Sequence, residues 1–249
     1  MRADFNSQPK PVWVSHRGLK LRAIENTRAA FDAALEAGFL NMETDLRITA
    51  DGHILLLHDV DLRRVAGIDK KIAAMTRSQI CQVETLSGGS LLFFDEFIEL
   101  YAAYNWVLDI KPESGFQVIE KLGAWVKSKK LHDWFLSQAK FLVWDKRQEA
   151  ALVETFGEVP RYANKSECWR SGLAVAAGIP AIGGIVPGRT YSLISKLGPI
   201  DLFQKHYVDQ FHTRGARVLA YLPATESEAK SAVEAGFDEI LTNGRPMLL

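Results

Sequence analysis

Short apolar runs alternate with longer amphipathic helical patterns along nearly the whole chain, and this alternation limits the folds open to it. Strands that are each followed by a helix pair in parallel, because the helix returns the chain across one face of the sheet. The predicted helices cover residues 26–38, 114–130, 145–157 and 225–236. The candidate strands cover residues 11–16, 40–49, 53–58, 106–111, 140–145, 160–164, 181–186, 217–222 and 239–243.

One candidate strand has a local explanation that separates it from the others. Only Asp51 and Gly52 stand between 40–49 and 53–58, and Asp-Gly is a strong signal for a tight hairpin. Segment 53–58 therefore turns back antiparallel, which leaves eight parallel strands. The fold class predicted is α/β, a (β/α)8 TIM barrel in a single domain over 1–249. A doubly wound open sheet is the alternative, but no G-x-G-x-x-G follows any strand.

Composition restricts the partners of this chain. Thirty basic residues balance thirty acidic ones, which predicts no nucleic-acid partner and requires any anion to be held by a local cluster. The two cysteines, Cys81 and Cys168, have no metal or redox spacing and indicate reduced thiols in a cytoplasmic protein. The least charged stretch, 172–188, is too short to cross a bilayer and reads as a buried helix and strand, so no stable membrane insertion is expected. Residues 1–14 contain no apolar leader segment, and no feature specifies an oligomeric state.

The predicted hairpin gathers charged side chains on one face. With a two-residue loop at 51–52, Asp45 lies directly opposite His58, where Cβ atoms are roughly 5 Å apart. Side chains alternate along a strand, so Glu43 shares the face of Asp45. Burying such like charges is costly unless a cation holds them. The hairpin alone therefore indicates a cation site.

Two other strand ends supply complementary groups. His16 and Arg17 end one apolar strand, and Asp109 and Lys111 share a face at the carboxyl end of another. In α/β barrels that end carries the catalytic residues. Three carboxylates suit one hard divalent cation, Mg²⁺ or Ca²⁺ with Mn²⁺ as a further option, and leave the histidines free for proton transfer. The basic residues can neutralise a phosphate diester.

These segments resemble a known family. The runs SHRG, IENT, METDLRITADGHILLLHDVDLRR and LDIKPE are similar, in order and spacing, to the signature of glycerophosphodiester phosphodiesterases. The likeness is close over 14–64 and 105–113 and loose elsewhere. It implies a (β/α)8 barrel and a small-molecule phosphodiester substrate. It also implies roles for seven residues: general acid/base His16 and His58, metal ligands Glu43, Asp45 and Asp109, and phosphate-binding Arg17 and Lys111.

The chain departs from the family pattern at several positions. Ile24 replaces the proline of P-E-N-T, and Asp109 stands where the third metal carboxylate is usually glutamate. The shorter arm of Asp109 is expected to shift the ion or admit a water. Tyr221 and Ala224 replace the Trp and Asn of a W-T-V-N segment, near the alcohol part of the substrate. The usual T-D-x-P ending reads Thr242-Asn243-Gly244-Arg245-Pro246.

The predicted activity is metal-dependent hydrolysis of a glycerophosphodiester to sn-glycerol 3-phosphate and an alcohol. The attacking oxygen belongs either to water or, through a cyclic phosphate, to a neighbouring substrate hydroxyl. A lysophospholipase D or a sphingolipid phosphodiesterase or lyase would use the same pocket, with apolar residues of 19–24 against an acyl chain. Remoter alternatives are a Schiff-base aldolase that uses Lys111 and a binding protein without activity.

Overall fold

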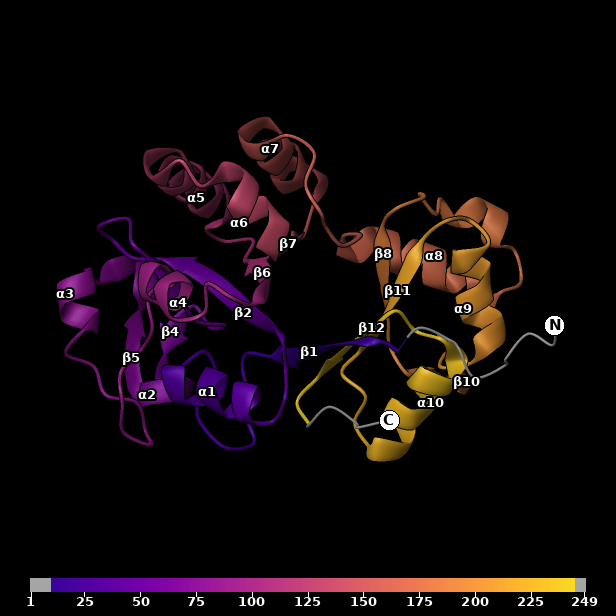
Figure 1. Cartoon of the computed structure of the whole chain (residues 1–249), viewed down its shortest axis with the longest axis horizontal. Coiled ribbons are helices and arrows are strands. Elements are labelled where there is room, and N and C mark those ends of the chain that lie inside the picture. Colours follow the sequence, from indigo (N-terminus) through magenta and orange to yellow (C-terminus); the bar gives the residue numbers. More distant parts are fainter. Residues whose placement is uncertain (1–9, 245–249) are drawn as a thin grey trace. The chain divides into compact units, whose positions relative to one another are not determined.

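The structure is a computed structural model and describes residues 10–244. The chain forms two compact units, and each is treated by itself. Of the described residues, unit 1 comprises 10–14 and 165–242, and unit 2 comprises 15–164 and 243–244. In Figure 1 the indigo to brown-red elements from α1 (Arg28–Glu36) to α7 (Lys146–Phe156) belong to unit 2, and the orange and yellow elements from α8 (Lys165–Ala176) onward belong to unit 1.

Three parallel strands form the sheet of unit 2. They are β2 (Asn41–Ile48), β6 (Asn105–Ile110) and β7 (Ala139–Leu142), and in their register Asp45 pairs with Asp109. The predicted strand 160–164 contributes a single parallel bridge beside β7. There the Phe141 backbone N–H donates to the Pro160 carbonyl at 2.9 Å. Strand β3 (Ile54–Leu56) pairs antiparallel with β2, as predicted.

Strand β1 (Val12–His16) belongs to both units. Its beginning lies in unit 1, where the Val12 N–H donates to the Asp238 carbonyl at 2.9 Å, and its last two residues lie in unit 2. The other strands of unit 1 are β8 (Thr190–Leu193), β11 (Arg217–Tyr221) and β12 (Glu239–Thr242), and β11 pairs in parallel with both of the others.

All four predicted helices form, and three of them begin at a residue whose side chain caps the helix. Helix α1 (Arg28–Glu36) begins at Thr27, whose side chain accepts from the Ala30 N–H, and α7 (Lys146–Phe156) begins at Asp145 in the same way. The others are α5 (Gly115–Lys129) and α10 (Glu226–Ala235). Further helices are α2 (Arg63–Ala66), α3 (Arg77–Ile80), α4 (Phe94–Leu100), α6 (His132–Gln138), α8 (Lys165–Ala176) and α9 (Lys205–His212), with 3₁₀ turns η1 (Ile72–Ala74) and η2 (Pro180–Gly183). Short strand pairs β4 (Asp61–Leu62) with β5 (Ile68–Lys71), and β9 (Lys196–Leu197) with β10 (Ile200–Asp201), lie in loops.

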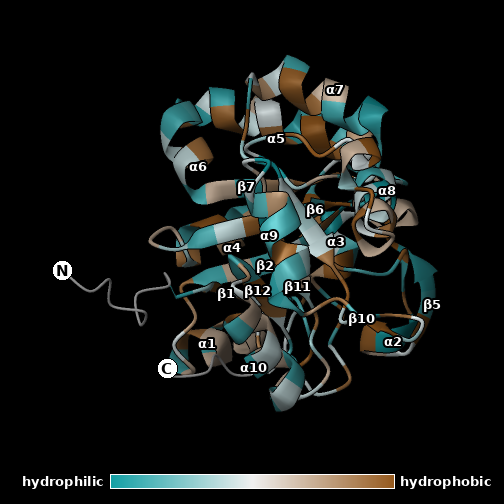
Figure 2. Cartoon of the chain, turned by 90° about the vertical axis from the view of Figure 1, so that its right-hand side faces the viewer, coloured by the Kyte–Doolittle hydropathy of each residue, from teal (hydrophilic) through white to brown (hydrophobic). Residues whose placement is uncertain are grey.

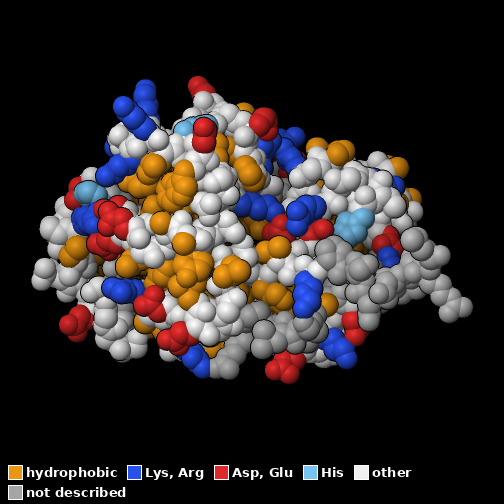
Figure 3. Space-filling view, in the orientation of Figure 1, with side chains coloured by type: hydrophobic (Ala, Val, Ile, Leu, Met, Phe, Trp, Pro, Cys, Tyr) orange, Lys and Arg blue, Asp and Glu red, His pale blue; other side chains and the backbone are white. Residues whose placement is uncertain are grey.

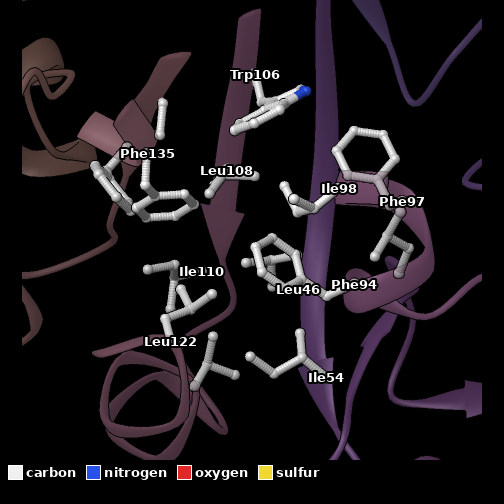
Figure 4. Packing of buried hydrophobic residues seen from close by; sticks show 14 of the residues in the cluster. Leu46, Ile54, Phe94, Phe97, Ile98, Trp106, Leu108, Ile110, Leu122 and Phe135 are labelled. Carbon is white, nitrogen blue, oxygen red and sulfur yellow. The ribbon is translucent and has the colours of Figure 1, made fainter. Parts of the chain in front are cut away.

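The largest core cluster of unit 2 lies between the sheet and its helices. Helices such as α5 and α7 carry both hydrophobic and hydrophilic residues (Figure 2), as expected of helices that bury one side. The face in Figure 3 shows basic and acidic side chains interspersed, with hydrophobic groups between them. Figure 4 shows the packing of this cluster, which includes Leu46 of β2, Leu108 and Ile110 of β6, Phe94 and Ile98 of α4, Leu122 of α5 and Phe135 of α6.

The hairpin register differs by one residue from the prediction. Thr49 N–H donates to the His53 carbonyl, so the loop has three residues, 50–52, instead of two. Gly52 has φ +81°, the left-handed conformation that ends a three-residue hairpin loop. Leu57 N–H then donates to the Asp45 carbonyl at 3.0 Å, and the predicted pairing of Asp45 with His58 is wrong.

The predicted strand 181–186 is also wrong. This segment begins with η2 and is largely exposed, with Ile182 at 68%. Pro180 cannot donate to a strand ladder, and Gly184 has φ +62°, so the local backbone turns instead of extending. The strand of this region is β8, which begins at Thr190 and buries Tyr191 completely.

Strand followed by helix is thus the repeating unit of the chain. Eight segments of residues 10–244 occupy the strand positions of this repeat: β1, β2, β6, β7, the bridge at Arg161, β8, β11 and β12. The α/β class is confirmed. Among these residues no helix is long and apolar enough to span a membrane. The prediction that 1–249 form a single domain stays a prediction.

Candidate active site

Alternation along β2 and β6 separates the core from a polar interior. Met42 and Leu46 of β2, and Leu108 of β6, point into the helix layer and join the hydrophobic cluster. The odd-numbered residues between them point to the opposite face. These inward residues are the charged ones: Glu43, Asp45, Arg47, Asp109 and, just after β6, Lys111.

Three carboxylates meet at this inner face. One oxygen of each of Glu43, Asp45 and Asp109 lies within 4.8 Å of the others, and all three side chains are buried. The parallel register causes this, because Asp45 and Asp109 are direct partners across the strands and Glu43 lies two residues before Asp45. The predicted convergence of these residues is therefore observed.

Two cations of the protein lie against the carboxylates. The Lys111 ammonium is 2.6 Å from Asp45 Oδ1 and 2.5 Å from Asp109 Oδ2, and only 4% of its side chain is exposed. Arg17 Nε lies 3.0 Å from Asp45 Oδ2, although its N–H is not aligned as a hydrogen bond. Arg17 N–H donates to Glu43 Oε2 at 3.1 Å. Both predicted phosphate-binding residues thus lie beside the triad.

The pKa values of the three carboxyl groups reflect their burial and the charges around them. Burial raises the pKa of Glu43 well above its ordinary value, and the carboxylates of Asp45 and Asp109 raise it further. Burial likewise raises the pKa of Asp109, and Lys111 reverses this only in part. Burial alone would raise the pKa of Asp45 too, but Lys111 and Arg17 hold it below its ordinary value. Two cations do not fully neutralise three buried carboxylates.

His16 lies at the end of β1 with its ring against the triad. Its Nδ1 donates to Asn243 Oδ1 at 2.7 Å, and Nε2 faces Glu43 Oε2 at 3.9 Å. Burial and the charge of Arg17 lower the pKa of His16 to about 4. The ring is therefore neutral at pH 7, with the Nε2 lone pair directed to the acidic cluster.

His58 lies beyond the end of β3 and is more exposed than His16, with 38% of its side chain accessible. Its Nδ1 lies 2.7 Å from Asp59 Oδ1. Asp59 thus holds the imidazole, while Leu57, the residue before His58, occupies the position across from Asp45. His58 therefore lies in the same unit as the triad, but it does not face Asp45 across the hairpin.

Three further residues complete the polar interior, and none of them is among the seven residues predicted for the site. Trp144 follows β7 and donates from Nε1 to Asp109 Oδ1 at 2.8 Å, with the Lys111 ammonium 5.4 Å from its ring centre. Asn26 donates to Asp45 Oδ2 at 2.8 Å. Glu25 accepts from Arg17 Nη1 at 2.8 Å.

Backbone conformation brings the loop after β1 to the site. Arg17 and Asn26 have φ +60° and +58°, and the Asn26 N–H donates to the Arg17 carbonyl at 3.0 Å. Between them Gly18 has φ +77°, and a Cβ there would lie 2.6 Å from the Ala30 carbonyl carbon. Glycine is thus the residue that this turn accepts.

Two carboxy-terminal departures from the family pattern fall in different places. Tyr221 ends β11 in unit 1, with 38% of its surface exposed, and Ala224 follows in the loop before α10. Asn243 belongs to unit 2, where it contacts His16. Arg245 and Pro246 lie outside the described residues.

Known proteins resemble the chain in both sequence and fold. The glycerophosphoryl diester phosphodiesterase family model matches residues 16–153. A protein named probable glycerophosphodiester phosphodiesterase 1, from Mycobacterium tuberculosis, is 28% identical over 208 residues, 71% of this chain and 73% of that one.

Solved structures resemble most of the chain in fold. The glycerophosphoryl diester phosphodiesterase domain of an uncharacterized Mycobacterium tuberculosis protein has a TM-score of 0.79 at 15% identity, covering 95% of this chain and 97% of that one. An Oleispira antarctica phosphodiesterase in complex with the product sn-glycerol-3-phosphate has a TM-score of 0.72 at 18% identity, covering 95% and 94%. The predicted (β/α)8 barrel is confirmed. The chain is an enzyme of the phosphoric diester hydrolases and belongs to the glycerophosphoryl diester phosphodiesterase family.

Proposed function

We propose that the protein hydrolyses glycerophosphodiesters to sn-glycerol 3-phosphate and an alcohol, with a divalent cation held by Glu43, Asp45 and Asp109. The buried triad beside a neutral His16 carries this proposal. Family membership and the product complex of the Oleispira antarctica phosphodiesterase support the substrate class.

The donor set fits a hard divalent cation. All three candidate ligands are carboxylates, the oxygen donors that Mg²⁺, Ca²⁺ and Mn²⁺ prefer. The raised pKa of Glu43 supports the fit, since it reflects burial of this carboxyl group together with the negative charges of Asp45 and Asp109, which Arg17 and Lys111 offset only in part. When bound, such an ion supplies a Lewis acid for a phosphate oxygen.

Arg17 and Lys111 bind the phosphate in this proposal. Both side chains are buried beside the triad, where electrostatic interactions are stronger than in water. Their cations are held in place before substrate arrives, so they stabilise charge that develops on the phosphate without rearranging. Trp144 and Glu25 fix the groups around them by hydrogen bonds.

His16 acts as the general base and His58 as the general acid. The His16 Nδ1–H is donated to Asn243, so Nε2 carries the lone pair that takes a proton from the attacking oxygen. The His58 ring is oriented by Asp59 at Nδ1, and its Nε2 delivers a proton to the leaving alcohol. The attacking oxygen is that of water or of the adjacent glycerol hydroxyl, and ³¹P NMR separates the two routes by detecting a cyclic phosphate.

One assay tests this proposal directly. EDTA-treated protein is refilled with Mg²⁺, Ca²⁺ or Mn²⁺ and offered glycerophosphocholine, glycerophosphoethanolamine and lysolipids. The phosphomonoester released is measured, which is glycerol 3-phosphate from the first two and lysophosphatidate from the lysolipids. Chelation and Asp45→Asn should each abolish release. Asp69→Asn, which alters a carboxylate 75% exposed on β5, should not. Turnover that persists after chelation, or in Asp45→Asn, contradicts the proposal.

A lysophospholipase D activity is the second candidate, and one observation favours it. Leu21 is 73% exposed in the loop that joins Arg17 to Glu25, two residues of the polar interior. An acyl chain there would bury its apolar surface. This candidate predicts that kcat/KM rises with acyl length and that Leu21→Ser removes the increase, while glycerophosphocholine turnover is unchanged.

The Schiff-base aldolase finds less support. Burial opposes the charge of Lys111, but Asp109 and Asp45 raise its pKa above the ordinary value, which keeps the amine protonated. A Schiff-base lysine must be neutral to attack a carbonyl. The cytoplasmic location inferred from Cys81 and Cys168 stays a prediction.

A further inference from the structure

The His58 ring is attached to a chain of ion pairs that extends beyond its immediate partner. Its Nδ1 lies 2.7 Å from Asp59 Oδ1, and the second oxygen of Asp59 accepts from Arg64 Nε at 2.6 Å. Asp59 therefore cannot rotate without breaking a second contact. A carboxylate held at both oxygens fixes the ring that it binds more firmly than one held at a single oxygen.

Arg64 is in turn anchored to a buried group. Its Nη2 donates to Glu25 Oε1 at 2.8 Å, and only 7% of the Glu25 side chain is exposed. The same Glu25 oxygen accepts from Arg17 Nη1 at 2.8 Å. Burial opposes ionisation of Glu25, but Arg64 and Arg17 outweigh it and lower its pKa. One ionised carboxylate thus joins the loop of His58 to the loop of Arg17.

The main chain of His58 is held from another direction. Arg47, a buried residue of β2, donates from Nε at 2.8 Å and from Nη2 at 2.5 Å to the His58 carbonyl. The backbone position and the ring orientation of His58 are therefore controlled by separate groups. Arg47 fixes the backbone, and the Asp59–Arg64–Glu25 chain fixes the ring.

The preceding residue, Arg63, forms an ordinary surface ion pair and serves as a comparison for Arg64. Arg63, also on α2, pairs with Asp69, and both side chains are largely exposed, at 64% and 75%. Such exposed pairs contribute about 0–1 kcal/mol to the free energy of unfolding and do little to fix the orientation of the side chains that they join. Arg64 differs because one of its two partners is buried and the other binds a candidate catalytic group.

We propose that Arg64 is a positioning residue, which acts through Asp59 and is anchored by Glu25 to hold the His58 imidazole in its catalytic orientation. This inference rests on the proposed function, in which His58 transfers the proton to the leaving alcohol. Loss of the anchor leaves the ring free to adopt other rotamers, and the population aligned with the leaving group falls. Substrate binding depends on other residues, so the effect falls on kcat.

The test compares two neighbouring arginines in the cation-loaded enzyme. Arg64→Met should lower kcat for glycerophosphocholine by roughly 10–100-fold with KM changed less than about 2-fold, a cost in the range known for misplaced catalytic groups. Arg63→Met should match the wild type. Arg64→Lys should be intermediate, since a single ammonium cannot reproduce the two-sided guanidinium contact. Asp59→Asn, which cuts the same link at its other end, should resemble Arg64→Met.

Two further measurements separate positioning from general damage. In a His58→Gln background, Arg64→Met should cause no additional loss, because the two act in series. The His58 Nδ1–H resonance should be visible in ¹H–¹⁵N spectra of the wild type and of Arg63→Met, and lost in Arg64→Met. A kcat for both Arg64→Met and Asp59→Asn equal to that of Arg63→Met overturns the inference. An additional loss of the same factor in His58→Gln also overturns it.

Failure of the proposed function is recognised separately. If His58→Gln retains wild-type turnover, His58 is not the general acid, and both statements fall. If His58→Gln has a strongly lowered kcat while Arg64→Met and Asp59→Asn are fully active, only the positioning role is wrong.

Discussion

Acidification should cost the metal-free protein stability because His16 is buried as a neutral ring. Its pKa is about 4 in the folded protein, against an ordinary value of 6.5. Between these values the unfolded chain binds a proton that the folded protein does not, so the free energy of unfolding falls as the pH falls. At pH 4.5 the loss from this one residue is about 2–3 kcal/mol relative to pH 7.5, where it is negligible.

The assay compares wild type with His16→Gln, so that the carboxyl groups titrating in the same range cancel to first order. Urea unfolding in EDTA at pH 7.5 and 4.5 gives the free energy of unfolding for each protein. The wild type should lose about 2–3 kcal/mol more than the variant on acidification. Equal losses would refute the argument, because they would mean that the His16 ring is as easily protonated in the folded protein as in the unfolded chain.

Two further predictions concern the groups that hold the carboxylates. Lys111→Met should destabilise the metal-free protein by about 3–5 kcal/mol in urea unfolding, because Asp45 and Asp109 lose a buried counter-charge. Saturating Mn²⁺ should restore part of the lost stability. An unchanged unfolding midpoint in EDTA would contradict the prediction. Trp144→Phe should weaken Mn²⁺ binding by about 10–100-fold in calorimetry, because the donor that orients Asp109 is lost. Trp169→Phe, at an exposed position of α8, should bind Mn²⁺ as tightly as the wild type does. Equal Mn²⁺ affinities of the two variants would exclude a role of Trp144 in orienting Asp109.

The triad could be predicted because it depends on short-range regularities. The two-residue period of a strand puts Glu43 and Asp45 on one face, and a parallel neighbour brings Asp109 beside them. The family resemblance led to the same residues independently.

The exact pairing of His58 could not be predicted, because Asp-Gly is compatible with loops of two and three residues. The observed loop adds one residue, and a one-residue shift changes the facing partner of Asp45 from His58 to Leu57. The prediction of a strand at 181–186 was wrong for a different reason. An apolar run signals burial, but Pro180 and the surrounding glycines kept it from extending.

The ion-pair chain around His58 has no local signature at all. Arg64 and Glu25 are separated by 39 positions, and Trp144 and Asp109 by 35. Adjacent arginines 63 and 64 are indistinguishable in sequence, yet one pairs at the surface and the other reaches a buried carboxylate. Only the folded arrangement of the loops separates them.

The central claim is that three buried carboxylates grip one cation, and crystals grown with Mn²⁺ test it most directly through anomalous scattering. The account predicts one strong peak with Glu43, Asp45 and Asp109 oxygens at about 2.0–2.6 Å, the range of hard divalent ions. A peak held by other residues, or a fully active enzyme with no peak among these three, would contradict it.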